Sequence, residues 1–485
     1  MATLKKQNQC LFDYDLDIHF YKLGHWINDP NGLVFINNQY HLFYQMNPDD
    51  IVWGNMHWGH AVSTDCLHWE HRPIALSAEP EGLGYIFSGG AVYDKFNTSN
   101  LGSEANPPVV LSFTHHDANE VQRQSLAYSI DGMQTFNKYA NNPVIENPGI
   151  KDFRDPKIIW VKNIDKWVMS VVAGKKVQFY SSSNLLDWEL LSEFGEGKGC
   201  QDGVWECPDL FPLKSSNSVE TKWILLISIN PGGPNGGSGM QYFVGDFIDG
   251  VFVDSTNDTK WLDYGTDFYA GISWDNLNDK PTRRRIIAWM SNWDYANQLP
   301  SKSYKSAMSL PRDISLYSTE KGEDKDYELH MSFCPNVSTL VSNEIKGNIK
   351  PNTITFTQLN FAFNLLLSKE DILEDDISIM LSNETEEFLE IIISSTAKQI
   401  IVDRNNFIWD DKSFQRTITA PFESSNSKFD LNLIVDSCSI ELLVDEGKRS
   451  ITSLFFPMSR LNQLSIISLA NKKLKTKLYE LKSIW

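Results

Sequence analysis

The segment HAVSTD at residues 60–65, with Trp69 beyond it, recurs as LAYSID at 126–131 with Phe136 and as QFYSSS at 178–183 with Trp188. Each copy has a short apolar run, a serine or aspartate turn, and an aromatic residue six or seven positions after a serine. Repeats of about 50 to 65 residues, each a few strands long, are typical of the blades of a β-propeller. We therefore predict an all-β chain with a five-bladed β-propeller over residues 1–320.

The pattern changes after this region. The charged stretch KGEDKD at 321–326 marks the start of a predicted linker over 321–345. Residues 346–485 contain longer alternating runs, such as FLEIII at 388–393 and IELLV at 440–444, which favour a C-terminal β-sandwich domain. Turn similarity in the first part could also arise by coincidence in one large β-sandwich, and the repeats alone leave that alternative open.

The composition limits the kind of partner. The formal net charge is -19 and the pI is near 5.0, whereas nucleic acids and anionic membrane surfaces attract concentrations of Lys and Arg. Aromatic residues make up 12% of the chain, and a minority of them are available for stacking on a ligand. We expect a neutral sugar as the substrate, no nucleic acid and no membrane partner. A homo-oligomer is left open.

The cysteines and the N-terminus bear on metal binding and on location. The six cysteines show no CxxC pairing and no His partners at zinc spacing, so we expect free thiols in a reducing compartment, no metal and no cofactor. Residues 1–20 lack the apolar stretch of a signal peptide, which predicts a cytoplasmic protein. A leader removed beforehand would leave the same sequence and would make the protein secreted.

Three acidic residues share one local setting: Asp29 in NDPNG at 28–32, Asp155 in FRDP at 153–156, and Glu206 in WECP at 205–208. Each precedes a proline that is expected to be the first residue of a strand, a position where proline is tolerated. A fold that starts equivalent strands at one end would bring the three carboxylates together. Two carboxyls in different environments beside an aromatic cleft are the parts of a glycosidase.

Each motif also has a structural interpretation. Asn, Asp, Pro and Gly are the residues that turns prefer, so NDPNG could be a turn, and Asp155 could pair with its neighbour Arg154. Glu206 is harder to explain in this way, because glutamate is a poor turn former. His115, His116 and Asp117 are interpreted as a surface turn rather than a metal site.

In this order, HWINDPNG at 25–32, FSG at 87–89, FRDPK at 153–157 and WECPD at 205–209 resemble glycoside hydrolase family 32, the invertases, inulinases and levanases. The resemblance covers essentially the whole chain and includes GMQYFVGD at 239–246 and WMSNW at 289–293. It implies a five-bladed β-propeller followed by a β-sandwich, and cleavage of terminal β-fructofuranosyl units with retention of configuration.

By position, the resemblance makes Asp29 the nucleophile, Asp155 the transition-state stabiliser and Glu206 the general acid/base. It also implies substrate contacts from ten further residues: Asn28, Gln45, Trp53, Phe87, Ser88, Arg154, Asn230, Tyr269, Trp289 and Trp293. Departures from the family pattern are modest. Asp313 follows Arg312 where a glutamate is usual, which puts a role for that carboxylate in doubt.

The leading hypothesis is an exo-acting hydrolase of sucrose and/or fructans such as levan, inulin and fructo-oligosaccharides. The alternatives are a sucrose-6-phosphate hydrolase, a fructosyltransferase that uses the same residues, and a fructan-binding module without catalysis. An inverting five-bladed glycosidase acting on arabinose-containing polymers is a further alternative. Carboxyl groups about 5–5.5 Å apart would support retention, and roughly 6.5–9.5 Å inversion.

Overall fold

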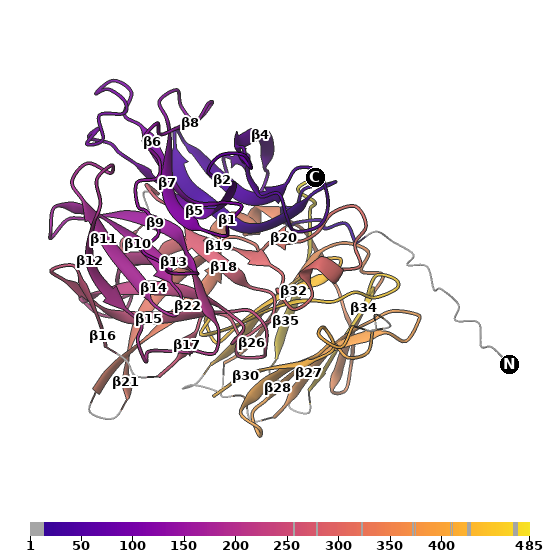
Figure 1. Cartoon of the computed structure of the whole chain (residues 1–485). Coiled ribbons are helices and arrows are strands. Elements are labelled where there is room, and N and C mark those ends of the chain that lie inside the picture. The colour runs from indigo at the N-terminus through magenta and orange to yellow at the C-terminus, as the bar shows by residue number, and fades with distance from the viewer. Residues whose placement is uncertain are drawn as a thin grey trace.

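The computed structural model describes residues 14–255, 258–277, 280–321, 324–370, 373, 375–407, 409, 411–423, 428–468 and 474–485. The regular elements of these residues are almost only β-strands, which confirms the all-β prediction (Figure 1). The two described helical elements are the short 3-10 helices η1 (Ala296–Gln298) and η2 (Pro335–Leu340). No described helix has the length and apolar character needed to cross a bilayer.

The first part of the chain forms five antiparallel sheets in succession. The first two consist of β1 (Trp26–Ile36), β2 (Gln39–Asn47), β3 (His57–Ser63) and β4 (Glu70–Leu76), and of β5 (Tyr85–Tyr93), β6 (Val109–His116), β7 (Gln122–Ser129) and β8 (Asn137–Lys138). The third consists of β9 (Phe153–Val161), β10 (Lys166–Ala173), β11 (Val177–Ser182) and β12 (Glu189–Phe194).

The fourth and fifth sheets each carry an additional short strand. The fourth has β13 (Val204–Lys214), β14 (Thr221–Asn230), β15 (Gly239–Ile248) and β16 (Val251–Asp254), with β17 (Lys260–Trp261) paired to β15. The fifth has β18 (Tyr269–Ser273), β19 (Arg284–Met290), β21 (Arg312–Lys321) and β22 (Asp324–Phe333), with β20 (Ala307–Met308) paired to β19.

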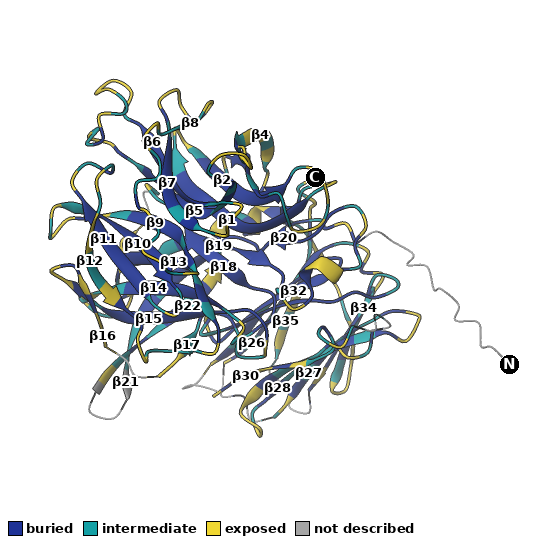
Figure 2. Ribbon diagram, in the orientation of Figure 1, coloured by how far each residue is buried: buried dark blue, intermediate teal, exposed yellow. Residues whose placement is uncertain are grey.

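These five sheets close into a ring. The first strand of each sheet contacts the first strand of the next, in the order β1, β5, β9, β13 and β18, and β18 in turn contacts β1. The three sequence repeats fall at equivalent places, because each lies on the third strand of its sheet (β3, β7 or β11) and the turn that follows. Figure 2 shows that the strands at the middle of the ring are buried while the loops around it are exposed.

The first strands share an irregularity near their starts. The register shifts lie between Ile27 and Pro30 in β1, Phe87 and Gly89 in β5, Arg154 and Lys157 in β9, Glu206 and Asp209 in β13, and Tyr269 and Ile272 in β18. A bulge of this kind breaks the hydrogen-bond ladder locally and re-aims a side chain. The five strands therefore turn side chains out of the regular pleat at the same end of the ring.

The bulges correct one expectation. Pro30, Pro156 and Pro208 do not open their strands, because β1, β9 and β13 begin three or four residues earlier. The residues before each proline pair with the neighbouring strand, and the interrupted ladder at the bulge tolerates a residue that lacks an N–H. Each carboxylate therefore lies within a strand rather than in a loop that precedes it.

The remainder of the chain forms two larger antiparallel sheets, drawn in orange and yellow in Figure 1. The six-stranded sheet has the order β23 (Val341–Ile345), β35 (Lys475–Leu481), β26 (Phe363–Lys369), β31 (Phe429–Val435), β32 (Ser439–Val444) and β33 (Arg449–Leu454). The seven-stranded sheet has the order β24 (Asn348–Lys350), β25 (Thr353–Thr357), β34 (Gln463–Ser468), β27 (Ile377–Ser382), β28 (Phe388–Ser394), β29 (Gln399–Asp403) and β30 (Thr417–Pro421). Alternate residues from both sheets join in one hydrophobic core, as alternating strands require.

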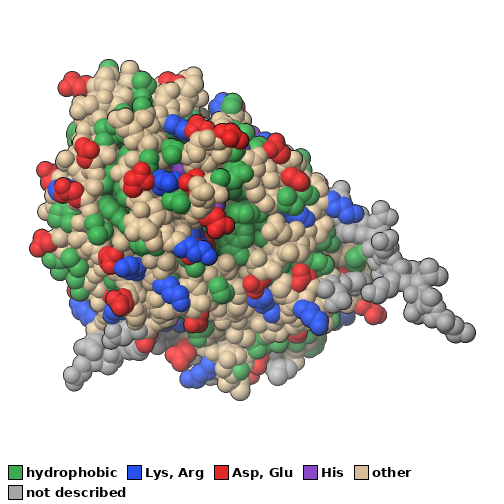
Figure 3. All heavy atoms as spheres, viewed as in Figure 1, with side chains coloured by type: hydrophobic (Ala, Val, Ile, Leu, Met, Phe, Trp, Pro, Cys, Tyr) green, Lys and Arg blue, Asp and Glu red, His purple; other side chains and the backbone are tan. Residues whose placement is uncertain are grey.

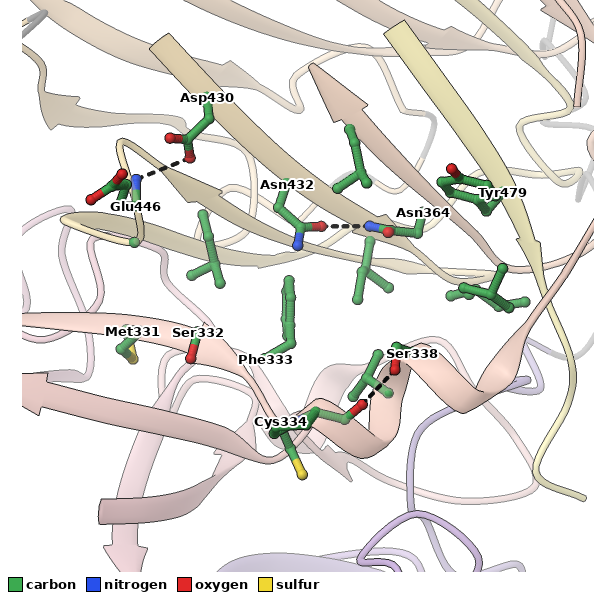
Figure 4. A pocket seen from close by; sticks show the side chains of 18 residues that line it. Met331, Ser332, Phe333, Cys334, Ser338, Asn364, Asp430, Asn432, Glu446 and Tyr479 are labelled. Carbon is green, nitrogen blue, oxygen red and sulfur yellow. Dashed lines mark hydrogen bonds between the residues drawn. The ribbon is translucent and has the colours of Figure 1, made fainter. Parts of the chain in front are cut away.

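The junction between the ring and the six-stranded sheet is polar and buried. Arg312, at the start of β21, forms ion pairs with Asp263 and with Glu441 on β32. Asp313 points to a different partner, with Oδ1 at 2.8 Å from Nε of Arg285, which gives this carboxylate a structural role. A cavity of about 790 Å³ also lies at this junction, between the end of β22 and the six-stranded sheet (Figure 4).

Candidate active site

A second cavity, of about 430 Å³, lies where the bulged ends of the first strands meet. The described residues that line it come from all five sheets and their loops: Asn28, Asp29, Gln45, Trp53, Met56, Phe87, Ser88, His116, Gln122, Arg154, Asp155, Glu206, Trp293 and Asn297. All three predicted carboxylates are in this set. Residues separated by more than 170 positions in the sequence therefore meet in one cavity, as the sequence predicts.

Asp29 is almost fully buried, with 9% of its surface exposed. Its Oδ2 accepts a 2.6 Å hydrogen bond from the Ser88 hydroxyl, and its Oδ1 accepts a 3.0 Å hydrogen bond from Nδ2 of Asn28. Burial and the charge of Glu206 raise the pKa of Asp29, while the hydrogen bonds from Ser88 and Asn28 oppose that rise. These two donors thus favour the ionised form of a carboxylate that burial would neutralise.

Asp155 occupies the bulge of β9 with a φ of 65°, in the left-handed region that few non-glycine residues adopt. Its Oδ2 accepts a 3.0 Å hydrogen bond from the backbone N–H of Cys207, and its own N–H donates to Thr114. Burial raises the pKa of Asp155 to about 7; Arg154 opposes this, and the charges of Glu206 and Asp29 add to it.

Glu206 is held at both carboxylate oxygens. Nη2 of Arg154 donates to Oε1 at 2.8 Å, and the hydroxyl of Tyr269 donates to Oε2. The side chain keeps 19% of its surface exposed, more than that of Asp155 at 5%. Glu206 is therefore the carboxyl among these two that water and a departing group can reach.

Arg154 connects the acidic residues. Its Nη1 donates to Asp152 at 2.7 Å, and its Nε lies 4.0 Å from Oδ2 of Asp155. Although burial works against the charged form, the charges of Glu206 and Asp155 raise the pKa of Arg154. The guanidinium therefore stays charged and offsets part of the repulsion between the carboxylates.

One side of the cavity is aromatic. Trp53 is 45% exposed and lies edge-on to Phe87 and to Trp293, with ring centroids 6.3 and 6.4 Å away. Beside these rings, the buried amide nitrogen Nε2 of Gln45 has no hydrogen-bond partner among the described residues. A flat apolar surface next to an unpaired donor suits a sugar, which has apolar C–H faces and hydroxyl acceptors.

Three of the residues predicted to contact substrate are not among the described residues that line the cavity: Asn230, Tyr269 and Trp289. Tyr269 reaches the site through its hydrogen bond to Glu206. Trp289 is fully buried and packs against Trp293 at 4.8 Å between ring centroids, so it supports the aromatic wall from behind. Asn230 is the last residue of β14, where it pairs with Val204 at the start of β13.

Four lining residues were missed by the sequence analysis: Met56, His116, Gln122 and Asn297. The surface turn predicted at His115 and His116 is wrong, because both residues end strand β6, and the His116 ring stacks on Phe87 at 4.5 Å. Asn297 accepts a 3.1 Å hydrogen bond from the backbone N–H of Trp53. Periodicity in β6 was the available signal for His116, whereas Asn297 reaches Trp53 only because the ring closes.

The charges on the surface agree with a neutral ligand. On the face shown in Figure 3, Asp and Glu side chains alternate with Lys and Arg, without a continuous basic area. Inside the cavity the described cation Arg154 is engaged by Glu206 and Asp152. The arrangement places carboxyl groups in different surroundings in one cavity, which is what proton transfer and attack at a sugar carbon require.

Comparison with known proteins agrees with this geometry. Residues 19–330 match the glycosyl hydrolases family 32 N-terminal domain, and residues 334–484 match the family 32 C-terminal domain. The chain is 38% identical over 490 residues to a levanase of Bacillus subtilis, covering 98% of this chain and 71% of that protein.

Solved structures give the same result. The exo-inulinase of Aspergillus awamori is 32% identical, with a TM-score of 0.88 over 98% of this chain and 100% of the other. A fructofuranosidase of Schwanniomyces occidentalis complexed with fructosylnystose is 30% identical, with a TM-score of 0.86 over 97% and 98%. The chain therefore belongs to glycosyl hydrolases family 32.

Proposed function

We propose that this protein is a retaining, exo-acting β-fructofuranosidase that hydrolyses terminal β-D-fructofuranosyl units of sucrose and of fructans. The observation that carries this proposal is the convergence of Asp29, Asp155 and Glu206 in one cavity of about 430 Å³ beside an aromatic wall. Membership of family 32 and the levanase and exo-inulinase named among its relatives support the same activity.

In the proposed mechanism, Asp29 attacks the anomeric carbon of the fructosyl unit while Glu206 donates a proton to the departing glycosidic oxygen. The fructosyl group is then bonded to Asp29. Glu206, now ionised, removes a proton from water, the water oxygen attacks the anomeric carbon, and the bond to Asp29 breaks. Asp155 accepts hydrogen bonds from fructosyl hydroxyls as positive charge develops on the ring.

The surroundings of each carboxyl fit its proposed role. Ser88 and Asn28 donate to both oxygens of Asp29, which supports the ionised form that a nucleophile needs. Arg154 and Tyr269 fix the orientation of Glu206, whose side chain stays partly exposed. Cys207 fixes Asp155 through a backbone N–H, so that carboxylate is oriented before substrate binds.

We also propose that the ring of five sheets is a five-bladed β-propeller and that the two larger sheets are a β-sandwich. The succession of four-stranded units and the contact of β18 with β1 support the propeller, and the shared hydrophobic core supports the sandwich. The sequence predicts a first domain over 1–320, a linker over 321–345 and a second domain over 346–485. Because β22 pairs with β21, we propose that the first domain extends to Phe333.

The experiment that tests the function uses D29A and E206Q in the full chain. We expect each to remove most hydrolysis of sucrose, inulin and levan while circular dichroism and the thermal midpoint stay close to wild type. E189Q, at the exposed start of β12, is the matched control and keeps full activity. Substantial residual activity in either site variant would exclude the proposed roles.

Stereochemistry and acceptor choice need a separate measurement. Proton NMR in the first minutes of turnover should show β-fructofuranose as the initial product, whereas the α anomer would show inversion. Separate incubations with sucrose, sucrose 6-phosphate, inulin and levan rank the substrates. The engagement of Arg154 by two carboxylates argues against the phosphorylated sugar. Products longer than the starting sugar would instead show fructosyl transfer.

A further inference from the structure

Two cysteine thiols meet at the place where the ring of five sheets closes. Cys66 lies in the turn between β3 and β4 of the first sheet, and Cys334 directly follows β22, the last strand of the fifth sheet. Their Sγ atoms are 3.5 Å apart although the residues are separated by 268 positions. Both side chains are buried, with 0% and 1% of their surface exposed.

Their backbones are held in place by neighbouring contacts. Nδ2 of Asn336 donates a 2.8 Å hydrogen bond to the carbonyl oxygen of Asp65, which joins the residues flanking the two thiols. The N–H of Cys334 donates to the carbonyl oxygen of Pro311 at 2.8 Å. The short distance between the sulfurs therefore belongs to an ordered contact between two segments, rather than to the chance orientation of two surface side chains.

We propose that Cys66 and Cys334 form a disulfide under oxidising conditions, which joins the first and fifth sheets covalently and makes the stability of the ring depend on redox state. A disulfide bond is about 2.05 Å long, so the sulfurs, now 3.5 Å apart, must approach by about 1.5 Å for the bond to form. Figure 4 shows the Cys334 sulfur pointing away from the cavity at the junction, so closing the bond leaves that cavity free.

The other described cysteines do not offer such a pair. Cys207 donates to Asp29 and Asp155, Cys200 to the carbonyl oxygen of Gly232, and Cys438 to that of Tyr14. Among the described cysteines, only Cys66 and Cys334 have their sulfur atoms in contact. The selectivity of the proposed bond follows from this arrangement.

The oxidant is a small-molecule disulfide, here oxidised glutathione, which acts while the chain folds and the thiols are accessible. In the proposed sequence, Cys334 loses its proton to water and supplies the first thiolate. It attacks one glutathione sulfur and releases one glutathione thiolate. The Cys66 thiolate then attacks Sγ of Cys334 and releases the second. Two protein thiols are oxidised, and one glutathione disulfide is reduced to two thiols.

The test compares the wild-type full chain refolded with dithiothreitol and refolded with a mixture of reduced and oxidised glutathione. Thiol titration in denaturant should find six free thiols in the first sample and four in the second, since the chain has six cysteines. Peptide mapping without reduction should then recover one cross-linked pair, containing Cys66 and Cys334. The thermal midpoint of the oxidised sample should be higher by about 3 to 5 °C.

Variants separate this bond from general effects of oxidation. C66S and C334S should each show the same thermal midpoint in both buffers, whereas the matched control C200S should keep the redox-dependent shift. The wild-type comparison needs no variant, so a substitution that fails to fold does not weaken the test. A folded oxidised sample without the Cys66–Cys334 peptide, or with that peptide and no rise in thermal midpoint, would overturn the proposal.

Discussion

Replacing Ser88 by alanine should shift the acidic limb of the activity profile to higher pH. The Ser88 hydroxyl donates a 2.6 Å hydrogen bond to Oδ2 of Asp29, and this bond opposes the rise in the pKa of Asp29 that burial causes. The proposed nucleophile must be ionised to attack. Without the hydroxyl, Asp29 binds a proton more readily, so activity is lost at a higher pH as acid is added.

The size of this pH shift follows from the free energy of the hydrogen bond between Ser88 and Asp29. A hydrogen bond to a charged group contributes about 1.5–3 kcal/mol, and one pKa unit corresponds to about 1.4 kcal/mol. Removal of the hydroxyl should therefore move the acidic limb upward by about 1 to 2 pH units. Hydrogen bonds from Asn28 and Cys207 to Asp29 persist in S88A, so the carboxylate stays oriented and activity above the new limb should largely return.

The assay is kcat/KM for sucrose between about pH 3 and pH 8, in wild type and in S88A. S439A is the matched control, because the Ser439 hydroxyl is also fully buried but has no hydrogen-bond partner among the described residues. Its profile should coincide with wild type. A folded S88A whose acidic limb moves by less than about 0.3 units would refute the argument that Ser88 keeps Asp29 ionised.

Three further predictions concern binding, catalysis and stability. Q45L should raise KM for sucrose by about 10-fold or more, because a substrate hydroxyl loses its hydrogen-bond donor. Its thermal midpoint should be unchanged or higher, because a buried unpaired amide is removed. Equal KM values for Q45L and wild type would contradict this prediction. Y269F should lower kcat by about 10- to 150-fold through loss of the hydrogen bond to Glu206, measured at saturating sucrose with circular dichroism as the control for folding. Burial by itself lowers the pKa of His19, but Asp436 and Glu441 outweigh it and raise the pKa to about 9 from 6.5. The corresponding stability, about 3 kcal/mol, should be fully present below pH 6.5 and lost as the pH rises through 9, and denaturant titrations of H19Q should lack this dependence.

Sequence patterns predicted the convergence of the carboxylates, because repeated strands that start at one end of a ring must bring their first residues together. They did not predict how the strands begin. By local sequence preference, Pro30 and Pro208 would each be the first residue of a strand. In the structure, residues before both prolines already pair with the neighbouring strand, and a bulge interrupts the hydrogen-bond ladder there. Tertiary pairing outweighed the local preference of proline in these strands.

The aromatic residues show a similar limit. Trp289 and Trp293 lie four positions apart in one motif, and nothing local separates a residue that touches the ligand from one that supports it. In the fold, Trp293 lines the cavity while Trp289 is buried behind it. Which face of a strand end points into the cavity depends on the closure of the whole ring.

By itself, the sequence determined the all-β class and the family, and it predicted which three carboxyls meet, because alternation, turn residues and short motifs are properties of neighbouring positions. Only the tertiary structure decided which donors surround each carboxyl, that Asn297 supports Trp53, and that Cys66 meets Cys334. These contacts join positions more than 240 residues apart. Their distances depend on the packing of all five sheets into one ring, which no local pattern encodes.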